Sequence, residues 1–223
     1  MSITEREVRE LVSRVLTQCQ GMVPQKAAPG GGQEFPVEAS ARHVHLTREA
    51  VEALFGPGAR LTKKRDLSQP GEFLSQERVR LVSPKGELAN VAVLGPERSA
   101  VQVELSLTDA RALGVKAPVN LSGDLTGAGD VYIVGEKGML PAPGSVIAAR
   151  AHIHMTTADA ARLGVEDGQA VRVQVDTPRP VTFEEVVVRV KDTFALAMHI
   201  DLDEANACAL VTGGSGRIVR ALP

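Results

Sequence analysis

The most constraining feature of this sequence is a segment that occurs twice. Residues 43–47 read HVHLT, and residues 152–156 read HIHMT, 109 positions later. Each copy runs into a predicted helix, and each half later contains a second related segment, at residues 103–114 and 198–209. A repeat of about a hundred residues is too long for the unit of a solenoid and is typical of two similar domains with a shared or facing site.

Aligning the two halves by hand pairs side chains of different chemistry. The later segments superpose so that Glu104 falls on His199 and Ser106 falls on Asp201. The chain holds five histidines, and four of them form the two His-x-His pairs. The fifth, His199, therefore occupies the position that holds a glutamate in the first half.

Beyond residue 36 the chain alternates apolar and polar residues in short β-branched runs that Gly and Pro separate. This period and this length are typical of strands. The predicted strands lie in the runs 78–84, 87–96, 100–106, 130–138, 169–178 and 184–202. Three helices are predicted between them, each starting beside Thr and ending at Gly, at residues 47–56, 107–115 and 156–165. Many short strands with tight turns favour barrels or sandwiches.

The first 36 residues have a different texture. Within residues 1–20, apolar side chains recur every three or four positions and charged side chains fill the other face, which predicts an amphipathic helix. Residues 21–36 are rich in Gly and Pro and lack periodicity, so we interpret them as a flexible tether. Such a helix either binds a groove on a partner or packs on the main body. Its polar face mixes both signs, which disfavours a membrane surface.

Composition predicts an intracellular globular protein in a reducing compartment. Apolar residues make up 43% of a 23.6 kDa chain, enough to bury a core. A net charge of -2 without a block of like charge excludes electrostatic attraction to nucleic acid or membranes. Cys19 and Cys208 form neither a disulfide framework nor a metal knuckle, and we expect Cys208 to be buried packing. No secretory signal and no apolar run of about 20 residues is present.

The two His-x-His pairs predict a pair of metal sites. Alternate side chains of a strand share a face, so both imidazoles of each pair point the same way. Adding the aligned residue of the later strand gives two sets of N and O donors: His43, His45 and Glu104, and His152, His154 and His199. Three protein ligands with an open position are typical of catalytic zinc, although cobalt, iron and manganese accept the same donors.

A single His-x-His in a strand is more often an ordinary surface or core pair than a metal site. Two copies at equivalent positions, with the last histidine at a third equivalent position, favour the metal interpretation, and two zinc ions are expected. Glu104 depends on the alignment alone, because a glutamate in a strand is usually solvated.

Five segments of the chain carry a specific family resemblance. They read SARHVHLT, GPERSAVQVELS, NLSGDLTGAGDVYIVGEKG, RAHIHMT and MHIDLDEANA. Together they resemble the PduL type of phosphotransacylase, the phosphate propanoyltransferases of bacterial microcompartments. The match runs from about residue 37 to the C-terminus.

The resemblance implies a mainly β fold of two similar β-barrels, capped by short α-helices, with a dinuclear zinc site between them. We assign residues 37–118 to the first barrel and 119–223 to the second, with exchange of strands allowed. The resemblance also implies that residues 1–20 are an encapsulation peptide that binds shell or core proteins of the compartment. A homo-oligomer is expected.

The reaction that the resemblance implies converts a propanoyl- or acetyl-CoA and orthophosphate into acyl phosphate and coenzyme A. No activated Ser or Cys is required, because phosphate itself can attack the thioester carbonyl. Nor does the chain offer a convincing Ser-His-acid set once its histidines bind metal. Arg98 is the residue that the resemblance supports as the phosphate-binding cation, with a planar donor fork.

The coenzyme A contacts are less direct. Residues beside the motifs line the coenzyme A channel in similar proteins, and here these are Ser40, Lys64, Arg65 and Asn206. Arg42 and Arg150 precede the two His pairs and can serve either anion or be ordinary surface charges.

Two alternatives from other classes stay open. A dinuclear metallohydrolase would use the same ligands to cleave acyl-CoA with water and would need no phosphate. A noncatalytic microcompartment scaffold would keep metals for stability and bind no coenzyme A. Three ligands per metal, with no fourth candidate nearby, argue against the scaffold.

Overall fold

The computed structural model of the chain describes residues 33–219. The amphipathic helix predicted at residues 1–20 and most of the tether predicted at 21–36 lie outside these residues. The first described strand, β1 (Glu34–Ser40), begins inside the segment predicted as tether, so the end of that segment is strand. Within the described residues, no helix combines the length and the apolar character needed to span a bilayer.

The described residues contain fourteen strands and four helices. Besides β1, the strands are β2 (His43–His45), β3 (Lys63–Asp66), β4 (Phe73–Ser83), β5 (Gly86–Gly95), β6 (Gln102–Glu104), β7 (Val119–Asn120), β8 (Gly129–Val134), β9 (Met139–Ala149), β10 (His152–Met155), β11 (Ala170–Asp176), β12 (Val181–Val190), β13 (Ala197–Asp201) and β14 (Ser215–Val219). The helices are α2 (Arg48–Phe55), α3 (Leu107–Leu113), α4 (Thr157–Leu163) and α5 (Leu202–Ala207). All three predicted helices are present, and five of the six predicted strand runs each contain one strand. The sixth, 184–202, is two strands, β12 and β13, separated by a loop, and β3, β7, β9 and β14 lie outside the predicted runs.

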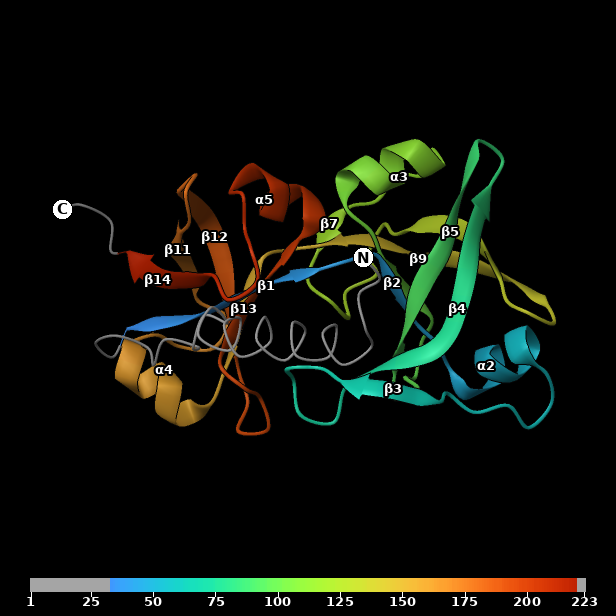
Figure 1. Cartoon of the computed structure of the whole chain (residues 1–223), viewed down its shortest axis with the longest axis horizontal. Coiled ribbons are helices and arrows are strands. Elements are labelled where there is room, and N and C mark those ends of the chain that lie inside the picture. Colours follow the sequence, from blue (N-terminus) through green and yellow to red (C-terminus); the bar gives the residue numbers. More distant parts are fainter. Residues whose placement is uncertain (1–32, 220–223) are drawn as a thin grey trace, which may run out of the picture. The chain divides into compact units, whose positions relative to one another are not determined.

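The strands close into two six-stranded barrels, as predicted. One barrel has the order β1-β13-β10-β12-β11-β14, with β14 pairing back onto β1. In the other, β4-β5-β2-β6-β9 form a continuous sheet, and β8 closes the ring by pairing with both β4 and β9. The short strands β3 and β7 extend this barrel outward from β4 and β9. We call it the first barrel, and the barrel that contains β1 and β10–β14 the second barrel. Figure 1 shows the two barrels side by side.

The barrels exchange strands. The first strand of the chain, β1, pairs in parallel with β13 and so belongs to the barrel built mostly from the C-terminal half. In turn β8 and β9, which follow residue 119, complete the barrel built from the N-terminal half. Strand pairing therefore crosses the position between residues 118 and 119 in both directions (Figure 1). Parallel pairing needs a long connection, and here a whole barrel provides it.

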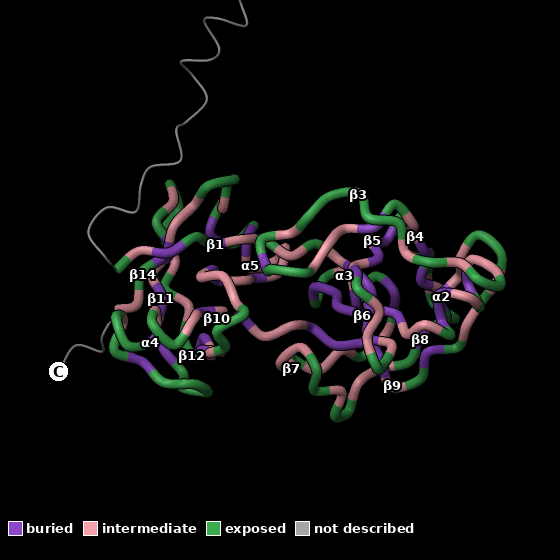
Figure 2. Tube along the Cα trace, turned by 90° about the horizontal axis from the view of Figure 1, so that it is seen from below, coloured by how far each residue is buried: buried purple, intermediate pink, exposed green. Residues whose placement is uncertain are grey.

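Each barrel has its own hydrophobic core, and the middle residue of each His-x-His segment belongs to it. Val44 is fully buried in the core of the first barrel, and Ile153 is fully buried in that of the second. Figure 2 shows buried residues gathered in the interior of both barrels. Because neighbouring residues of a strand point to opposite faces, the histidines on either side of Val44 and Ile153 point out of the barrel interior.

The helix termini follow the predicted capping chemistry with one correction. Thr47 caps α2 and Thr156 caps α4, and each of these helices is followed by Gly. The N-cap of α3 is Ser106 instead of the predicted Thr, because the Ser106 side chain accepts the hydrogen bond from the third residue of the helix. The corresponding cap of α5 is Asp201. The repeat alignment paired these two positions, and that pairing is confirmed, although α5 was not among the predicted helices.

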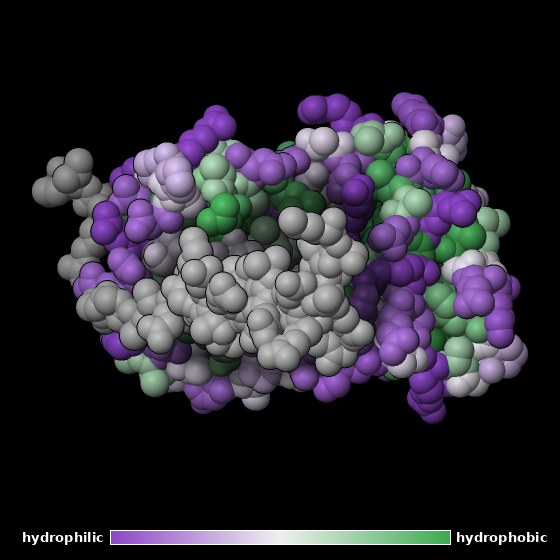
Figure 3. Space-filling view, viewed as in Figure 1, coloured by the Kyte–Doolittle hydropathy of each residue, from purple (hydrophilic) through white to green (hydrophobic). Residues whose placement is uncertain are grey.

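Large apolar side chains reach the surface at scattered places. Those exposed among the described residues are Leu107, Val119, Tyr132, Met139 and Val211, which lie on α3, β7, β8, β9 and the segment after α5. The coloured part of the face in Figure 3 mixes hydrophilic and hydrophobic residues. Isolated exposed apolar residues of this kind are ordinary in globular proteins.

Candidate metal centre

Strand register gives the two triads the same construction. His43 on β2 lies directly opposite Glu104 on β6, and His152 on β10 lies directly opposite His199 on β13. Directly opposite residues share a face of the sheet, and residues two apart on a strand share it too. Each predicted set of three therefore lies on one outer face of its own barrel.

The first triad is compact and buried. His43 Nε2 lies 3.4 Å from Glu104 Oε2, and His45 Nε2 lies 4.0 Å from Glu104 Oε1. Among the described residues this is the set of three potential ligands whose donor atoms all lie within 4.8 Å of one another. The three residues are between 3% and 8% exposed, so the set is shielded from bulk water. His43, His45 and Glu104 thus form a possible metal-binding triad.

The second triad consists of three imidazoles in mutual ring contact. The ring centroids of His152 and His154 are 4.7 Å apart, and the His199 centroid lies 5.3 Å from the first and 5.0 Å from the second. Phe194 covers His154 with a centroid distance of 4.2 Å. The Gln69 side-chain nitrogen lies 3.3 Å from His199 Nε2. These contacts fix the rings in an arrangement of neutral nitrogen donors.

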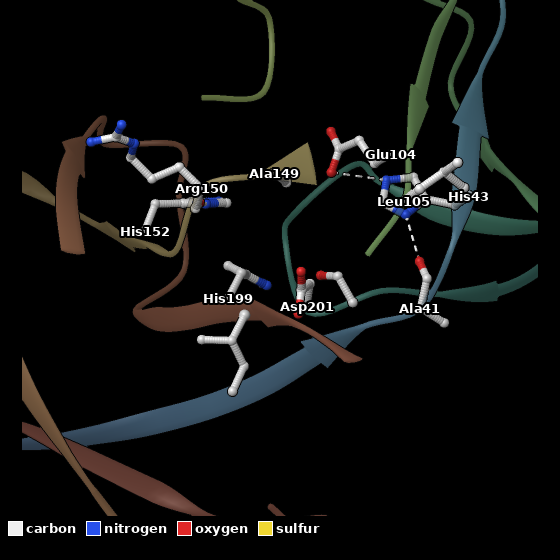
Figure 4. Close-up of a pocket in the computed structure, with 11 residues that line it drawn as sticks. Ala41, His43, Glu104, Leu105, Ala149, Arg150, His152, His199 and Asp201 are labelled. Atoms are coloured by element: carbon white, nitrogen blue, oxygen red, sulfur yellow. Dashed lines mark hydrogen bonds and ion pairs between the residues drawn. The ribbon is translucent and has the colours of Figure 1, made fainter. Parts of the chain in front are cut away.

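One pocket is lined by residues of both triads. Figure 4 shows His43 and Glu104 on one side of it and His152 and His199 on the other. The lining also contains apolar residues from β9, from β13 and from the segments after β1 and β6, and three polar residues: Ala149, Ile200, Ala41 and Leu105, with Ser40, Arg150 and Asp201. The pocket therefore combines convergent nitrogen and carboxylate donors with an apolar wall.

The buried imidazole nitrogens test whether these residues fit a metal. His43 Nδ1 lies 2.8 Å from the carbonyl oxygen of Ala41, and His152 Nδ1 lies 2.8 Å from that of Arg150, so these two rings are oriented by equivalent backbone contacts. Nδ1 of His45 and Nδ1 of His154 are buried without a hydrogen-bond partner. Leaving such a group unpaired costs about 1–3 kcal/mol. A bound metal would satisfy such a nitrogen, and the first triad, His43, His45 and Glu104, fits a metal ion.

The histidines are held in the neutral form that binds metals. Burial, together with the charges of neighbouring rings, lowers the pKa of His154 to about 2 and that of His199 to about 3. Burial likewise brings the pKa of His45 well below its usual value. All three rings are therefore unprotonated at neutral pH and keep a lone pair for a metal.

Glu104 is the one carboxylate of the two triads, and it stays ionised although it is buried. Burial alone would raise its pKa, but the His43 ring and a hydrogen bond from Ser122 outweigh this effect, so its pKa lies below the usual value. Gln102 Nε2 donates to Glu104 Oε1 over 2.6 Å. A charged oxygen ligand thus faces the first site, while the second site has none.

Gln102 links Glu104 to the loop after β7. Its amide oxygen accepts from the Gly123 backbone N–H at 2.9 Å, which determines the orientation of the amide. Its nitrogen then donates both to Glu104 and to the Ser122 hydroxyl, the latter at 2.9 Å. Gln102 is itself 4% exposed, so these contacts are protected from water.

Arg98 extends the same network to the side of the first triad. One guanidinium nitrogen donates to Glu72 over 2.9 Å, and another lies 3.5 Å from the Ser122 hydroxyl. The charge of Arg98 contributes to the lowered pKa of both His45 and Glu104. Arg98 therefore lies beside the triad, although it does not line the pocket of Figure 4.

The residues predicted to bind coenzyme A are found at different distances from the pocket. Ser40 lines it and is in register with Asp201. Lys64 and Arg65 lie on the exposed edge strand β3, and Asn206 lies on α5; none of these three lines the pocket.

The remaining predicted cations and Cys208 have structural partners. Arg150 lines the pocket, and its guanidinium lies 3.8 Å from Glu185. Arg42 pairs with Asp109 at 2.8 Å. Cys208 is fully buried, as predicted.

Sequence reasoning missed the polar residues that support the triads. Glu72 and Gln69 lie outside the segments that carry the family resemblance, whereas Ser122 and Gln102 lie inside two of them but were given no role. Glu72, Gln69 and Ser122 lie in loops whose position the sequence pattern does not determine. Gln102 offered a signal, because it stands two residues before Glu104 in a strand and so had to share its face.

Comparison with known proteins decides the family. A family model described as phosphate propanoyltransferase matches residues 36–211. The chain belongs to the phosphate propanoyltransferase family. A phosphate propanoyltransferase of Leptotrichia buccalis is 54% identical over 191 residues, covering 82% of this chain and 87% of the relative. One of Enterococcus faecalis is 46% identical over 213 residues, covering 96% and 95%.

A similar relative is the phosphate propanoyltransferase of Thermotoga maritima, which is 49% identical over 178 residues, covering 79% of this chain and 85% of the relative. These matches confirm the resemblance noted in the sequence. The chain is accordingly an enzyme of the acyltransferase class.

Proposed function

We propose that this protein transfers a short acyl group, propanoyl or acetyl, between coenzyme A and orthophosphate at a dinuclear metal centre. The observation that carries the proposal is the pocket between the two barrels, whose lining includes His43 and Glu104 from one triad and His152 and His199 from the other. Membership of the phosphate propanoyltransferase family supports the reaction type. Acetyl and propanoyl groups differ by one methylene, which is worth only about 1–3 kcal/mol of discrimination.

Two divalent ions, with zinc expected, would be held by the two triads. The neutral imidazoles, the ionised Glu104 and the orphaned Nδ1 atoms of His45 and His154 support this assignment. When bound, such ions supply Lewis acidity that polarises a carbonyl or phosphate oxygen and stabilises a leaving thiolate.

The protein side chains orient the two substrates. An oxygen of phosphate attacks the thioester carbonyl carbon, the new C–O bond replaces the C–S bond, and coenzyme A leaves as thiolate and takes up a proton. Arg98 offers two N–H donors in one plane, which match two phosphate oxygens. The Ser122 hydroxyl, 3.5 Å from Arg98, adds a further polar group beside the bound phosphate. The apolar wall formed by Leu105, Ala149 and Ile200 suits the acyl chain and limits the entry of water.

Coenzyme A would lie along the rim of the pocket. Ser40 lines the pocket directly, while Lys64 and Arg65 on the exposed strand β3 offer cations for the nucleotide phosphates. Asn206 on α5 provides an amide for the same ligand. Arg150 lines the pocket and is paired only at 3.8 Å, so it can contribute to either anion.

The test is a coupled assay on the full chain with propanoyl-CoA, in which free thiol and acyl phosphate are followed together. We expect equal amounts of both products, a strict need for phosphate, and loss of turnover on chelation with recovery on zinc addition. Thiol release that ignores phosphate would identify a metallohydrolase instead. Bound metal without any turnover would identify a scaffold.

The microcompartment assignment concerns residues 1–20, whose amphipathic pattern is that of an encapsulation peptide. Deleting residues 1–20 is expected to leave turnover within about twofold and to abolish loading into shells, measured by co-purification with shell proteins. A large loss of turnover would show instead that this segment belongs to the catalytic body. Sedimentation of the intact chain tests the proposed homo-oligomer.

A further inference from the structure

In each barrel, side chains in register on neighbouring strands form rows. Two residues along the strands from the row that lines the pocket lies a second row, and these second rows correspond between the barrels. In the first barrel, His45 on β2 is in register with Leu94 on β5 and Gln102 on β6. In the second barrel, His154 on β10 is in register with Arg189 on β12 and Ala197 on β13. Arg189 therefore stands beside His154, on the same outer face, where the first barrel has Leu94 beside His45.

The parallel pairs are β2 with β5 and β10 with β12. The segments that follow β5 and β12 also correspond between the two barrels. The backbone N–H of Arg98 donates to the carbonyl of Leu46 at 2.8 Å, directly after the first His-x-His segment. The backbone N–H of Lys191 makes the same contact with Met155 at 3.0 Å, directly after the second. Each barrel thus brings a cation to the end of its His-x-His strand, and the second barrel adds Arg189.

The Arg189 side chain is half-buried and has no hydrogen bond or ion pair with any other described residue. The other arginines near the site are paired: Arg98 with Glu72 at 2.9 Å, and Arg150 with Glu185 at 3.8 Å. A guanidinium that lies partly out of water against neutral imidazoles gains nothing from them electrostatically. Its position is favourable when an anion completes its hydrogen bonds.

The Arg189 guanidinium lies close enough to interact electrostatically with all three imidazoles of the second triad. Arg98, from the other barrel, likewise interacts with His154. Two guanidinium groups, one from each barrel, therefore lie near the same ring.

The pocket lies on the other side of these rings. Its lining contains His43, His152 and Arg150, and contains neither His45 nor His154. Arg189 is in register with His154 and Gln102 with His45, and neither lines the pocket, whose lining includes Arg150 and Asp201. Arg98, beside the first triad, does not line it either. We call the side of the centre with Arg98 and Arg189 the cationic side.

We propose that Arg189 is a second anion-binding arginine, which together with Arg98 holds orthophosphate on the cationic side while acyl-CoA occupies the pocket side. This inference rests on the proposed function and assigns the phosphate its place within that site. Two planar donor forks from different barrels suit a tetrahedral dianion, and phosphate delivered from that side meets the thioester carbonyl from the face opposite coenzyme A.

The decisive variant is Arg189→Leu, because leucine is the residue that the first barrel carries at this position. A lost hydrogen bond to a charged partner predicts a KM for phosphate that is about tenfold to hundredfold higher. The KM for propanoyl-CoA at saturating phosphate is expected to stay within about twofold. Arg189→Lys keeps the charge without the fork and should give an intermediate KM for phosphate. Arg172→Leu, on the neighbouring strand β11, where Arg172 pairs with Glu184 at 2.8 Å instead of facing the histidines, is the matched control and should change neither KM.

Phosphate binding without turnover provides the second readout. Orthophosphate should raise the melting temperature of the metal-loaded wild type and of Arg172→Leu, and should have much less effect on Arg189→Leu with the same metal content. Unchanged phosphate KM and unchanged protection would overturn the inference. So would a rise confined to the KM for coenzyme A, or loss of bound metal in both Arg189 variants, which would make the residue structural.

The two proposals fail in different ways. If wild type releases thiol without phosphate, the proposed function fails, whereas protection by phosphate still decides the role of Arg189. If wild type forms acyl phosphate and Arg189→Leu keeps its phosphate KM, only the assignment of Arg189 fails.

Discussion

The two barrels carry the same histidines on the same strands and surround them differently. Three corresponding pairs differ in charge or polarity: Glu104 and His199, Gln102 and Ala197, and Leu94 and Arg189. The first barrel surrounds its histidines with a carboxylate and an amide that supports it. The second surrounds its histidines with a third imidazole and an unpaired cation.

Under the proposed function, this difference gives the two metal sites of a duplicated scaffold unequal charge. A carboxylate ligand neutralises part of a divalent ion, whereas three neutral imidazoles leave the full charge. An anionic substrate is therefore expected to favour the side of the second barrel, where Arg189 adds to the attraction. Predictions that alter one barrel at a time test this division.

The largest effect is expected from removing one donor from each triad. Glu104→Ala and His199→Ala should each lower turnover by about 10³-fold or more, since a bound ion supplies several kcal/mol of transition-state stabilisation. Elemental analysis should show metal lost from each variant. Glu104→His keeps three donors, makes the first triad like the second, and should retain metal. Full metal content together with full activity in Glu104→Ala would remove Glu104 from the ligand set.

A smaller effect is expected at Gln102, which supports one barrel only. Gln102→Leu removes the donor to Glu104 Oε1 and should weaken metal binding by about 10–100-fold, the usual consequence of losing a partner of a metal ligand. Competition with a chelator measures this affinity. Gln174→Leu, on β11 of the second barrel, is the control, because the Gln174 side chain contacts Arg217 and neither triad. If the affinity of Gln102→Leu equals that of wild type, the orientation of Glu104 does not depend on this amide.

The smallest effect concerns α3 and α5, the helices that follow the two triads. Glu204 on α5 aligns with Asp109 on α3, which pairs with Arg42. Glu204 has acidic neighbours instead, and burial together with Asp201 and Asp203 raises its pKa to about 7. The folded state thus binds a proton that the unfolded state has released, so this stabilisation is present below about pH 4.5 and is lost as pH rises through about 7.

Glu204→Gln should therefore become more stable than wild type as pH rises from about 5 to about 8. Each pKa unit is worth 1.36 kcal/mol, and partial exposure reduces the total to about 1–2 kcal/mol. The glutamine oxygen can still accept from the Asp201 N–H. Urea unfolding at the two pH values measures the difference, and a difference that does not change with pH would contradict the raised pKa.

Much of this protein could be predicted from local pattern. Period-two runs predicted β4, β5, β6, β8, β11, β12 and β13, whereas β9 and β14 were not predicted. The apolar residue between each pair of histidines, Val44 or Ile153, is what turns the imidazoles out of the barrel. The N-cap of α3 was assigned to a Thr, because Ser106 and the Thr two residues later are both good caps and only the backbone conformation chooses between them.

The sequence by itself determined the duplication, the family and the strands with clear alternation, and it predicted the two sets of donors that the repeat aligns, because all of these depend on residues close together in the chain or on matching patterns. Only the tertiary structure decided that β1 and β9 change barrels, that Gln102 and Ser122 support Glu104, and that Arg189 stands unpaired beside His154. These facts depend on register and on contacts between distant segments, and no local periodicity specifies which strand edge a segment will join.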